Sequence, residues 1–108
     1  MLERRYVVID ERRGGGENIY VLEAGATEAD GIKALDYWWG YLTKSEKRDA
    51  RMELVLFAYD PEYEQEFPAG QKGAIVTPEM DSYAEAVEKG WDTRGAYNPI
   101  AVRESEEA

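Results

Sequence analysis

The sequence predicts an α+β fold, in which helices pack on one face of a mainly antiparallel sheet. Strand-like runs alternate with segments of helical periodicity in the order β-β-α-β, followed by a loop, a short strand, a helix and an edge strand. A short glycine-rich segment joins the first two strand-like runs, which is typical of an antiparallel hairpin. We expect a single domain over residues 1–103, because a chain of 108 residues has the length of one domain.

The first predicted element is a β-hairpin. Residues 6–11 and 18–24 are rich in β-branched residues, and Gly14, Gly15 and Gly16 lie between them. A glycine triplet beside two arginines is also the composition of a phosphate-binding loop. Such a loop leads from a strand into a helix N-terminus, whereas this one leads into a second strand, and we therefore favour a hairpin tip.

A helix is predicted to follow Thr27. Thr27 and Asp30 have the spacing of a capping box. The apolar residues that share one helical face, which we expect to cover the sheet, are Ile32, Leu35, Trp39 and Leu42, with Trp38 at the edge. Tyr37 and Tyr41 fall on a different side, where they either pack under a loop or form part of a contact surface.

Two further elements complete the first half. Thr43 and Glu46 repeat the capping-box spacing and predict a short helix that reaches residue 49 or 50. Residues 52–59 are the most strand-like stretch of the chain. Within them, residues 54–58 are apolar at even and odd positions alike, which is typical of a strand covered on two faces or central in the sheet.

The last third is predicted to begin with a flexible loop at 62–73, followed by a short strand at 74–76. Thr77 and the proline after it favour a helix start, and Gly90 is placed to end that helix, with Trp91 folding back on its last turn. Residues 97–103 predict an edge strand, and residues 104–108 an acidic, disordered tail.

The helix-and-cap pattern of residues 27–49 carries a family resemblance. It resembles small uncharacterised β-β-α-β proteins of bacterial genomes, phages and mobile elements, and the likeness covers residues 6–59. The resemblance implies a bacterial or mobile-element origin. It implies no activity, so no functional residue follows from it.

The charge of the chain is strongly negative, with a formal net value of −10. Residues 1–52 hold 9 Lys/Arg against 10 Asp/Glu, and residues 53–108 hold 4 against 13. This balance opposes direct binding of nucleic acid or an anionic membrane and favours basic partners. The alternative is that the acidity serves solubility alone.

Missing residue types narrow the chemistry. The chain contains no histidine and no cysteine, which removes imidazole bases, thiolate nucleophiles, disulfides and the usual zinc ligands. The absence of cysteine fits a reducing compartment, and no apolar run has the length of a membrane span. We therefore expect a soluble, cytoplasmic, non-enzymatic protein that uses no cofactor and no metal.

One acidic segment is the main predicted binding site. If its backbone is extended, acids at alternate positions share one face about 6.6 Å apart, twice the rise of a strand. The predicted binding residues are Asp60, Glu62, Tyr63, Glu64, Glu66 and Phe67. The row predicts a nucleic-acid mimic that occupies a basic groove, and the alternative is a solvated loop. A calcium loop of the EF-hand type is disfavoured, because Gln65 and Gln71 stand where it needs glycine and glutamate.

The function favoured by these patterns is binding of a basic protein surface, such as that of a nucleic-acid-binding protein, by the acidic C-terminal half. One alternative is a small carboxylate-based enzyme or ligand-binding domain. Another is a homodimer that pairs through Tyr37 and Tyr41 or through an open sheet edge, so monomer and homodimer both stay open.

Overall fold

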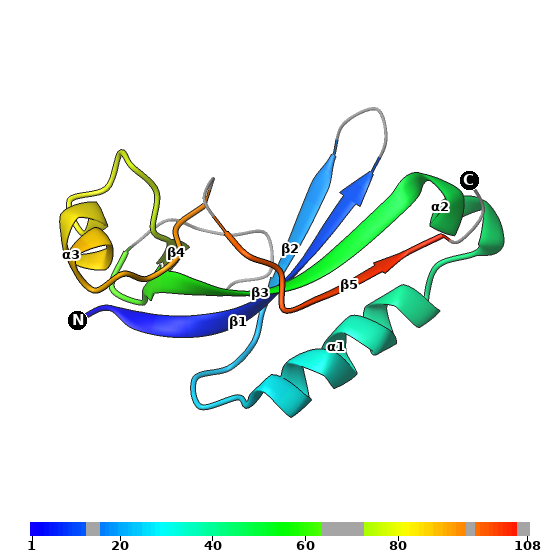
Figure 1. The fold of residues 1–108 in the computed structure, drawn as a ribbon, viewed down its shortest axis with the longest axis horizontal. Coiled ribbons are helices and arrows are strands. Elements are labelled where there is room, and N and C mark those ends of the chain that lie inside the picture. The colour runs from blue at the N-terminus through cyan, green and yellow to red at the C-terminus, as the bar shows by residue number, and fades with distance from the viewer. Residues whose placement is uncertain (13–15, 64–72, 95–96, 106–108) are drawn as a thin grey trace. The chain divides into compact units, whose positions relative to one another are not determined.

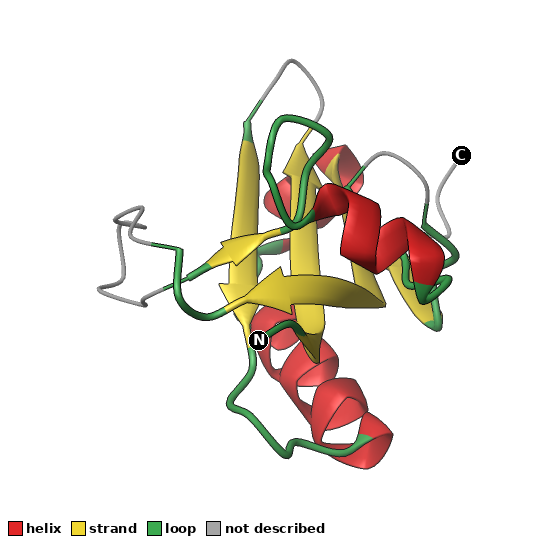
Figure 2. Cartoon of the chain, turned by 90° about the vertical axis from the view of Figure 1, so that its left-hand side faces the viewer, coloured by secondary structure: helices red, strands yellow, loops and turns green. Residues whose placement is uncertain are grey.

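The computed structural model describes residues 1–12, 16–63, 73–94 and 97–105. Its elements are β1 (Glu3–Arg12), β2 (Glu17–Val21), α1 (Glu28–Gly40), α2 (Lys44–Asp49), β3 (Ala50–Asp60), β4 (Ala74–Ile75), α3 (Tyr83–Glu88) and β5 (Ala101–Glu104). Strands pair in the order β2-β1-β3-β4, and β5 also pairs with β3 (Figure 1). Helices and an antiparallel curled sheet make up the chain, which confirms the α+β prediction (Figure 2).

The chain divides into two compact units, and the single domain expected from its length stays a prediction. Unit 1 comprises residues 1–5 and 56–98, and unit 2 comprises residues 6–55 and 99–108. The long strands β1 and β3 each contribute residues to both units. The sequence pattern does not reveal this division, because each strand reads as one uninterrupted run.

Unit 2 contains the predicted hairpin and the main helix. Strands β1 and β2 pair antiparallel with Val8 opposite Tyr20, and the Arg12 N–H donates to the Gly16 carbonyl at 3.2 Å. Gly16 has a φ of +110°, in the left-handed region where glycine is favoured. The tip at 13–15 lies outside the described residues.

Helix α1 begins as predicted. Thr27 and Asp30 form a capping box, in which each side chain accepts a hydrogen bond from the other residue's backbone N–H. The core beneath α1 consists of Val8, Leu35, Met52 and Leu54. The predicted helical face packs on this core, which places α1 over β1 and β3 and along β5 (Figure 1).

Strand β5 closes unit 2. It pairs antiparallel with β3, with Arg51 opposite Glu104 and Leu54 opposite Ala101. Glu104 therefore belongs to a strand, although it was expected to begin a disordered tail. Its carboxylate also lies 3.6 Å from Nε of Arg51. Ser105 has no regular structure, and residues 106–108 lie outside the described part.

Unit 1 has its own small core. Leu2, Ala58, Val76 and Ala86 are buried together, with Tyr83 and Trp91 packed against them. Helix α3 ends as predicted: the Gly90 N–H bonds to the Val87 carbonyl and the Trp91 N–H to the Ala86 carbonyl, each at 3.0 Å, and Gly90 has a φ of +70°.

The start of α3 differs from the prediction. The helix begins at Tyr83 and not at residues 77–79. Thr77 accepts a hydrogen bond from the Met80 N–H and Met80 accepts one from the Tyr83 N–H, each at 3.0 Å. These are two successive tight turns with three-residue spacing, and they take up the backbone groups that a helix would bond four residues apart.

Candidate functional site

Four aromatic rings of unit 2 form a continuous cluster, which we call the aromatic patch: Tyr20, Tyr37, Trp38 and Tyr41. Tyr20 of β2 stacks on Trp38 of α1 with centroids 4.1 Å apart and planes within 7° of each other. Tyr37 meets Trp38 edge-on at 5.2 Å and meets Tyr41 at 5.0 Å. Each ring therefore contacts another ring of the patch, and the four form one continuous aromatic surface.

The outer rings of the patch face solvent. Tyr37 is 56% exposed and Tyr41 is 68% exposed. The Tyr37 hydroxyl donates a hydrogen bond to the Tyr41 hydroxyl at 3.2 Å, and this bond raises the pKa of Tyr37 above its ordinary value of 10.0. Of the two interpretations of this pair, packing under a loop is wrong, because both side chains lie on the surface.

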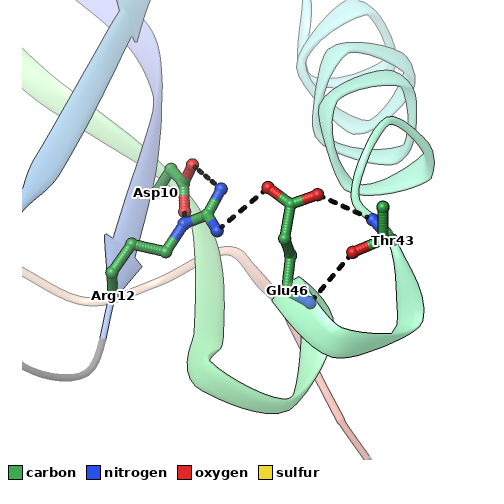
Figure 3. A network of polar contacts seen from close by, with 4 residues as sticks. All are labelled: Asp10, Arg12, Thr43 and Glu46. Carbon is green, nitrogen blue, oxygen red and sulfur yellow. Dashed lines mark hydrogen bonds and ion pairs between the residues drawn. The ribbon is translucent and has the colours of Figure 1, made fainter.

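A network of charged residues, which we call the ion network, lies elsewhere in unit 2 and links the hairpin to α2 (Figure 3). Asp10 is only 2% exposed, and its oxygens accept from Nε and Nη2 of Arg12 at 3.0 and 3.1 Å. Nη1 of Arg12 lies 3.6 Å from Glu46, whose carboxylate accepts from the Thr43 backbone N–H at 3.0 Å. The network holds two carboxylates against one guanidinium, which leaves one negative charge.

The ion network acts on the aromatic patch electrostatically. Burial raises the pKa of Tyr20 above its ordinary value of 10.0, the charge of Asp10 raises it further, and the charge of Arg12 opposes the change. Tyr20 therefore lies within electrostatic range of the network. Tyr20 pairs with Val8 across the hairpin, and Asp10 lies two residues beyond Val8 on the same strand, so this end of the patch is near the network.

A cavity of about 310 Å³ lies beside the ion network in unit 2. Three arginines and three acids contribute to its lining: Arg12, Arg48, Arg51, Glu11, Asp49 and Glu104. Arg51 forms ion pairs with the buried carboxylate of Glu53 and with Glu104. Because acids balance the lining arginines and further carboxylates hold Arg12 and Arg51, the cavity has no excess of positive charge that would favour an anionic ligand.

The structure describes only part of the acidic segment predicted to bind. Asp60 ends β3, and its carboxylate accepts from the Glu62 N–H at 3.1 Å, while its carbonyl accepts from the Tyr63 N–H at 3.4 Å. Glu62 also lies 3.3 Å from the N-terminal ammonium. The backbone turns at these residues, so the extended row of carboxylates does not begin at Asp60. The remaining candidates lie outside the described residues: Glu64, Glu66 and Phe67.

The fold distributes the negative charge differently from the sequence. Unit 1 holds 5 Lys/Arg against 10 Asp/Glu, and unit 2 holds 8 against 13, so each has a net charge of −5. The acidic end of the chain belongs to unit 2, whereas Arg4 and Arg5 belong to unit 1. The two folded units are therefore equally acidic, although most of the net negative charge lies in the second half of the sequence.

Within the described ranges, no group of three or more acidic residues is arranged to hold a metal ion. None of the helices that the structure describes combines the length and the apolar character needed to cross a bilayer. No protein family, curated protein or solved structure matches this chain. The resemblance to small β-β-α-β proteins of bacteria and mobile elements therefore stays a prediction.

Sequence reasoning found Tyr37 and Tyr41 but missed their two inner neighbours in the aromatic patch. Trp38 was assigned to the edge of the buried face, and Tyr20 was assigned to the strand alone. One contact between charged side chains of the ion network could have been predicted from the sequence: Asp10 and Arg12 are two residues apart in a strand, so their side chains share a face. The contact of Arg12 with Glu46 had no signal in sequence spacing.

Proposed function

We propose that this protein is a non-catalytic binding module whose aromatic patch contacts a basic protein. The observation that carries this proposal is the exposure of Tyr37 and Tyr41, two large rings that contact each other and Trp38. Their exposed area is available to a partner.

The residue types of the patch suit a protein interface. Tyrosine and tryptophan are enriched among the residues that dominate binding energy, because they bury a large area and retain a polar group. Contacts between the rings favour one arrangement of these side chains before binding, which reduces the conformational entropy lost on association. The hydroxyls of Tyr37 and Tyr41 add hydrogen-bonding groups at the surface.

Charge supports a basic partner. Unit 2 has a net charge of −5, and the ion network near Tyr20 holds two carboxylates against one guanidinium. Complementary charge accelerates association and disfavours acidic partners, including a second copy of this chain. The partner class that fits best is a protein with a lysine- or arginine-rich surface, such as one that binds nucleic acid.

The test is affinity capture with the tagged protein from a nuclease-treated bacterial lysate, followed by measurement of affinity with each purified candidate. We expect a basic protein to bind wild type and to bind the double variant Tyr37→Ala/Tyr41→Ala at least tenfold more weakly. The matched control is Val87→Ala, which shortens an exposed apolar side chain of unit 1. Equal affinity of the double variant, or a partner that is not basic, would contradict the proposal.

A further inference from the structure

This chain already places cations over several of its own aromatic rings. The guanidinium of Arg5 lies 4.7 Å from the ring centre of Tyr59, and the ammonium of Lys47 lies 5.6 Å from that of Trp39. Trp91 has two such neighbours, the ammonium of Lys89 at 4.7 Å and the guanidinium of Arg4 at 5.9 Å. These contacts are cation–π interactions, in which the negative face of the ring attracts the charge.

The outer rings of the aromatic patch differ from these. Within the part of the chain that the structure describes, no lysine or arginine lies over the ring of Tyr37 or of Tyr41. Both rings are more than half exposed. Their ring surfaces are therefore accessible to a cation supplied by another molecule.

The geometry of the pair suits a planar cation. The two rings are 5.0 Å apart and inclined by 62° to each other, so a group stacked on one ring has its edge near the other. The hydroxyl oxygens of both residues can accept hydrogen bonds from such a group. A guanidinium is planar and weakly hydrated and carries donors along its edge, whereas an ammonium is compact and strongly hydrated.

We propose that Tyr37 and Tyr41 stack an arginine side chain of the partner and thereby distinguish arginine from lysine. The occupant is an arginine-rich segment of a basic protein. Its attraction to this face follows from the net charge of −5 of unit 2 and from the ion network, whose Asp10 lies two residues from Val8, the partner of Tyr20 across the hairpin. This inference rests on the proposed function, because it identifies the side chain through which the basic partner is recognised.

The test compares two peptides of equal length and charge, an oligo-arginine and an oligo-lysine, by isothermal titration calorimetry at low ionic strength. Simple charge attraction is the same for both peptides, so it cancels in the ratio of their affinities. We expect the arginine peptide to bind about two- to fivefold more tightly, as expected for one exposed cation–π contact.

Three variants separate stacking from other causes. Tyr37→Ala/Tyr41→Ala should bring the ratio of affinities close to one, and Tyr37→Phe/Tyr41→Phe should keep most of it, because phenylalanine retains the ring. Val87→Ala, at an exposed residue of unit 1, is the matched control and should leave the ratio unchanged. Circular dichroism checks that each variant keeps its helices.

The outcomes distinguish the two proposals. Equal affinity for both peptides, or a ratio that persists without the two rings, overturns the arginine assignment and leaves binding of a basic partner standing. Failure of both peptides to bind at low ionic strength overturns the proposed function itself.

Discussion

Arg12 donates two hydrogen bonds to the buried carboxylate of Asp10, from Nε at 3.0 Å and from Nη2 at 3.1 Å. The two residues are adjacent on one face of β1, and Asp10 has almost no contact with solvent. The arginine therefore compensates a charge that water cannot reach. The same arginine extends to Glu46 at the first turn of α2, so that one side chain joins two segments distant in sequence.

Replacing Arg12 by methionine should strongly destabilise the protein. The change leaves the Asp10 carboxylate buried without its counter-charge, which costs about 3 kcal/mol for a buried pair. Urea unfolding measures this loss. Arg48→Met is the matched control, because Arg48 is exposed, and it should change the free energy of unfolding by less than about 1 kcal/mol. Equal effects of the two variants would show that the Asp10 pair has no special role.

Acid should weaken the fold through its two capping boxes. Hydrogen bonds from the backbone of Thr27 lower the pKa of Asp30 below 3.8, and those from Thr43 lower the pKa of Glu46 below 4.5. A carboxylate with a lowered folded pKa contributes stability that is fully present above its unfolded pKa. This contribution is lost as the pH falls through the folded pKa, so the loss begins below about pH 5 and continues below pH 4.

The acid effect can be separated from other carboxylates with amide variants. In Asp30→Asn/Glu46→Gln the side-chain oxygens can still accept the capping hydrogen bonds, but they no longer titrate. Urea unfolding over this pH range should therefore give a shallower loss of stability for the double variant than for wild type. Identical slopes would mean that other groups cause the acid sensitivity.

Two glycines of α1 should respond to alanine in opposite directions. A Cβ at Gly31 would lie 2.8 and 2.9 Å from the two Cδ atoms of Leu54, which is fully buried, whereas a Cβ at Gly40 meets nothing within 4 Å. Gly31→Ala should cost about 1–3 kcal/mol through overpacking. Gly40→Ala should stabilise by up to about 1 kcal/mol, because alanine favours the helix. Thermal unfolding measures the stability of both variants relative to wild type. A gain in stability for Gly31→Ala would show that the Leu54 side chain moves aside at little cost.

The hydroxyl pair of the aromatic patch should be visible in a titration. The Tyr37 hydroxyl donates a hydrogen bond to the Tyr41 hydroxyl. This bond stabilises the neutral form of Tyr37 and raises its pKa above 10.0. In Tyr41→Phe the acceptor is absent, so the pKa of Tyr37 should fall toward its ordinary value. The pKa of Tyr37 is measured by NMR from the chemical shifts of its assigned ring carbons as the pH is raised. An unchanged pKa would show that the two hydroxyls are not bonded in solution.

Features that depend on residues three or four positions apart were predicted correctly from sequence. Both capping boxes begin at the expected threonines, and Gly90 directly follows the C-cap residue of α3. Each is set by backbone groups and side chains within one helical turn, so the necessary information is local. The predicted start of α3 was wrong. Thr77 and Met80 form tight turns in place of the first helical turn, and the local sequence is compatible with both structures.

The features that sequence could not supply are those that bring distant segments together. The stack of Tyr20 on Trp38 depends on where α1 crosses β2, and the contact of Arg12 with Glu46 depends on where α2 meets the hairpin. The charge of each unit also depends on which segments fold together. Half of the candidate patch was therefore predictable, because Tyr37 and Tyr41 lie four residues apart at the end of α1, whereas the stack of Tyr20 on Trp38 joins segments distant in sequence.

Helix α2 has only six residues, which is too short to persist as an isolated helix in water. Glu46 stabilises its first turn and also binds Arg12, so the helix and the hairpin should open together as one cooperative segment. Amide protons of α2 should then exchange with solvent at the rate set by opening of the hairpin. A fluctuation at Arg12 would in this way be transmitted to a helix that begins more than thirty residues further along the chain.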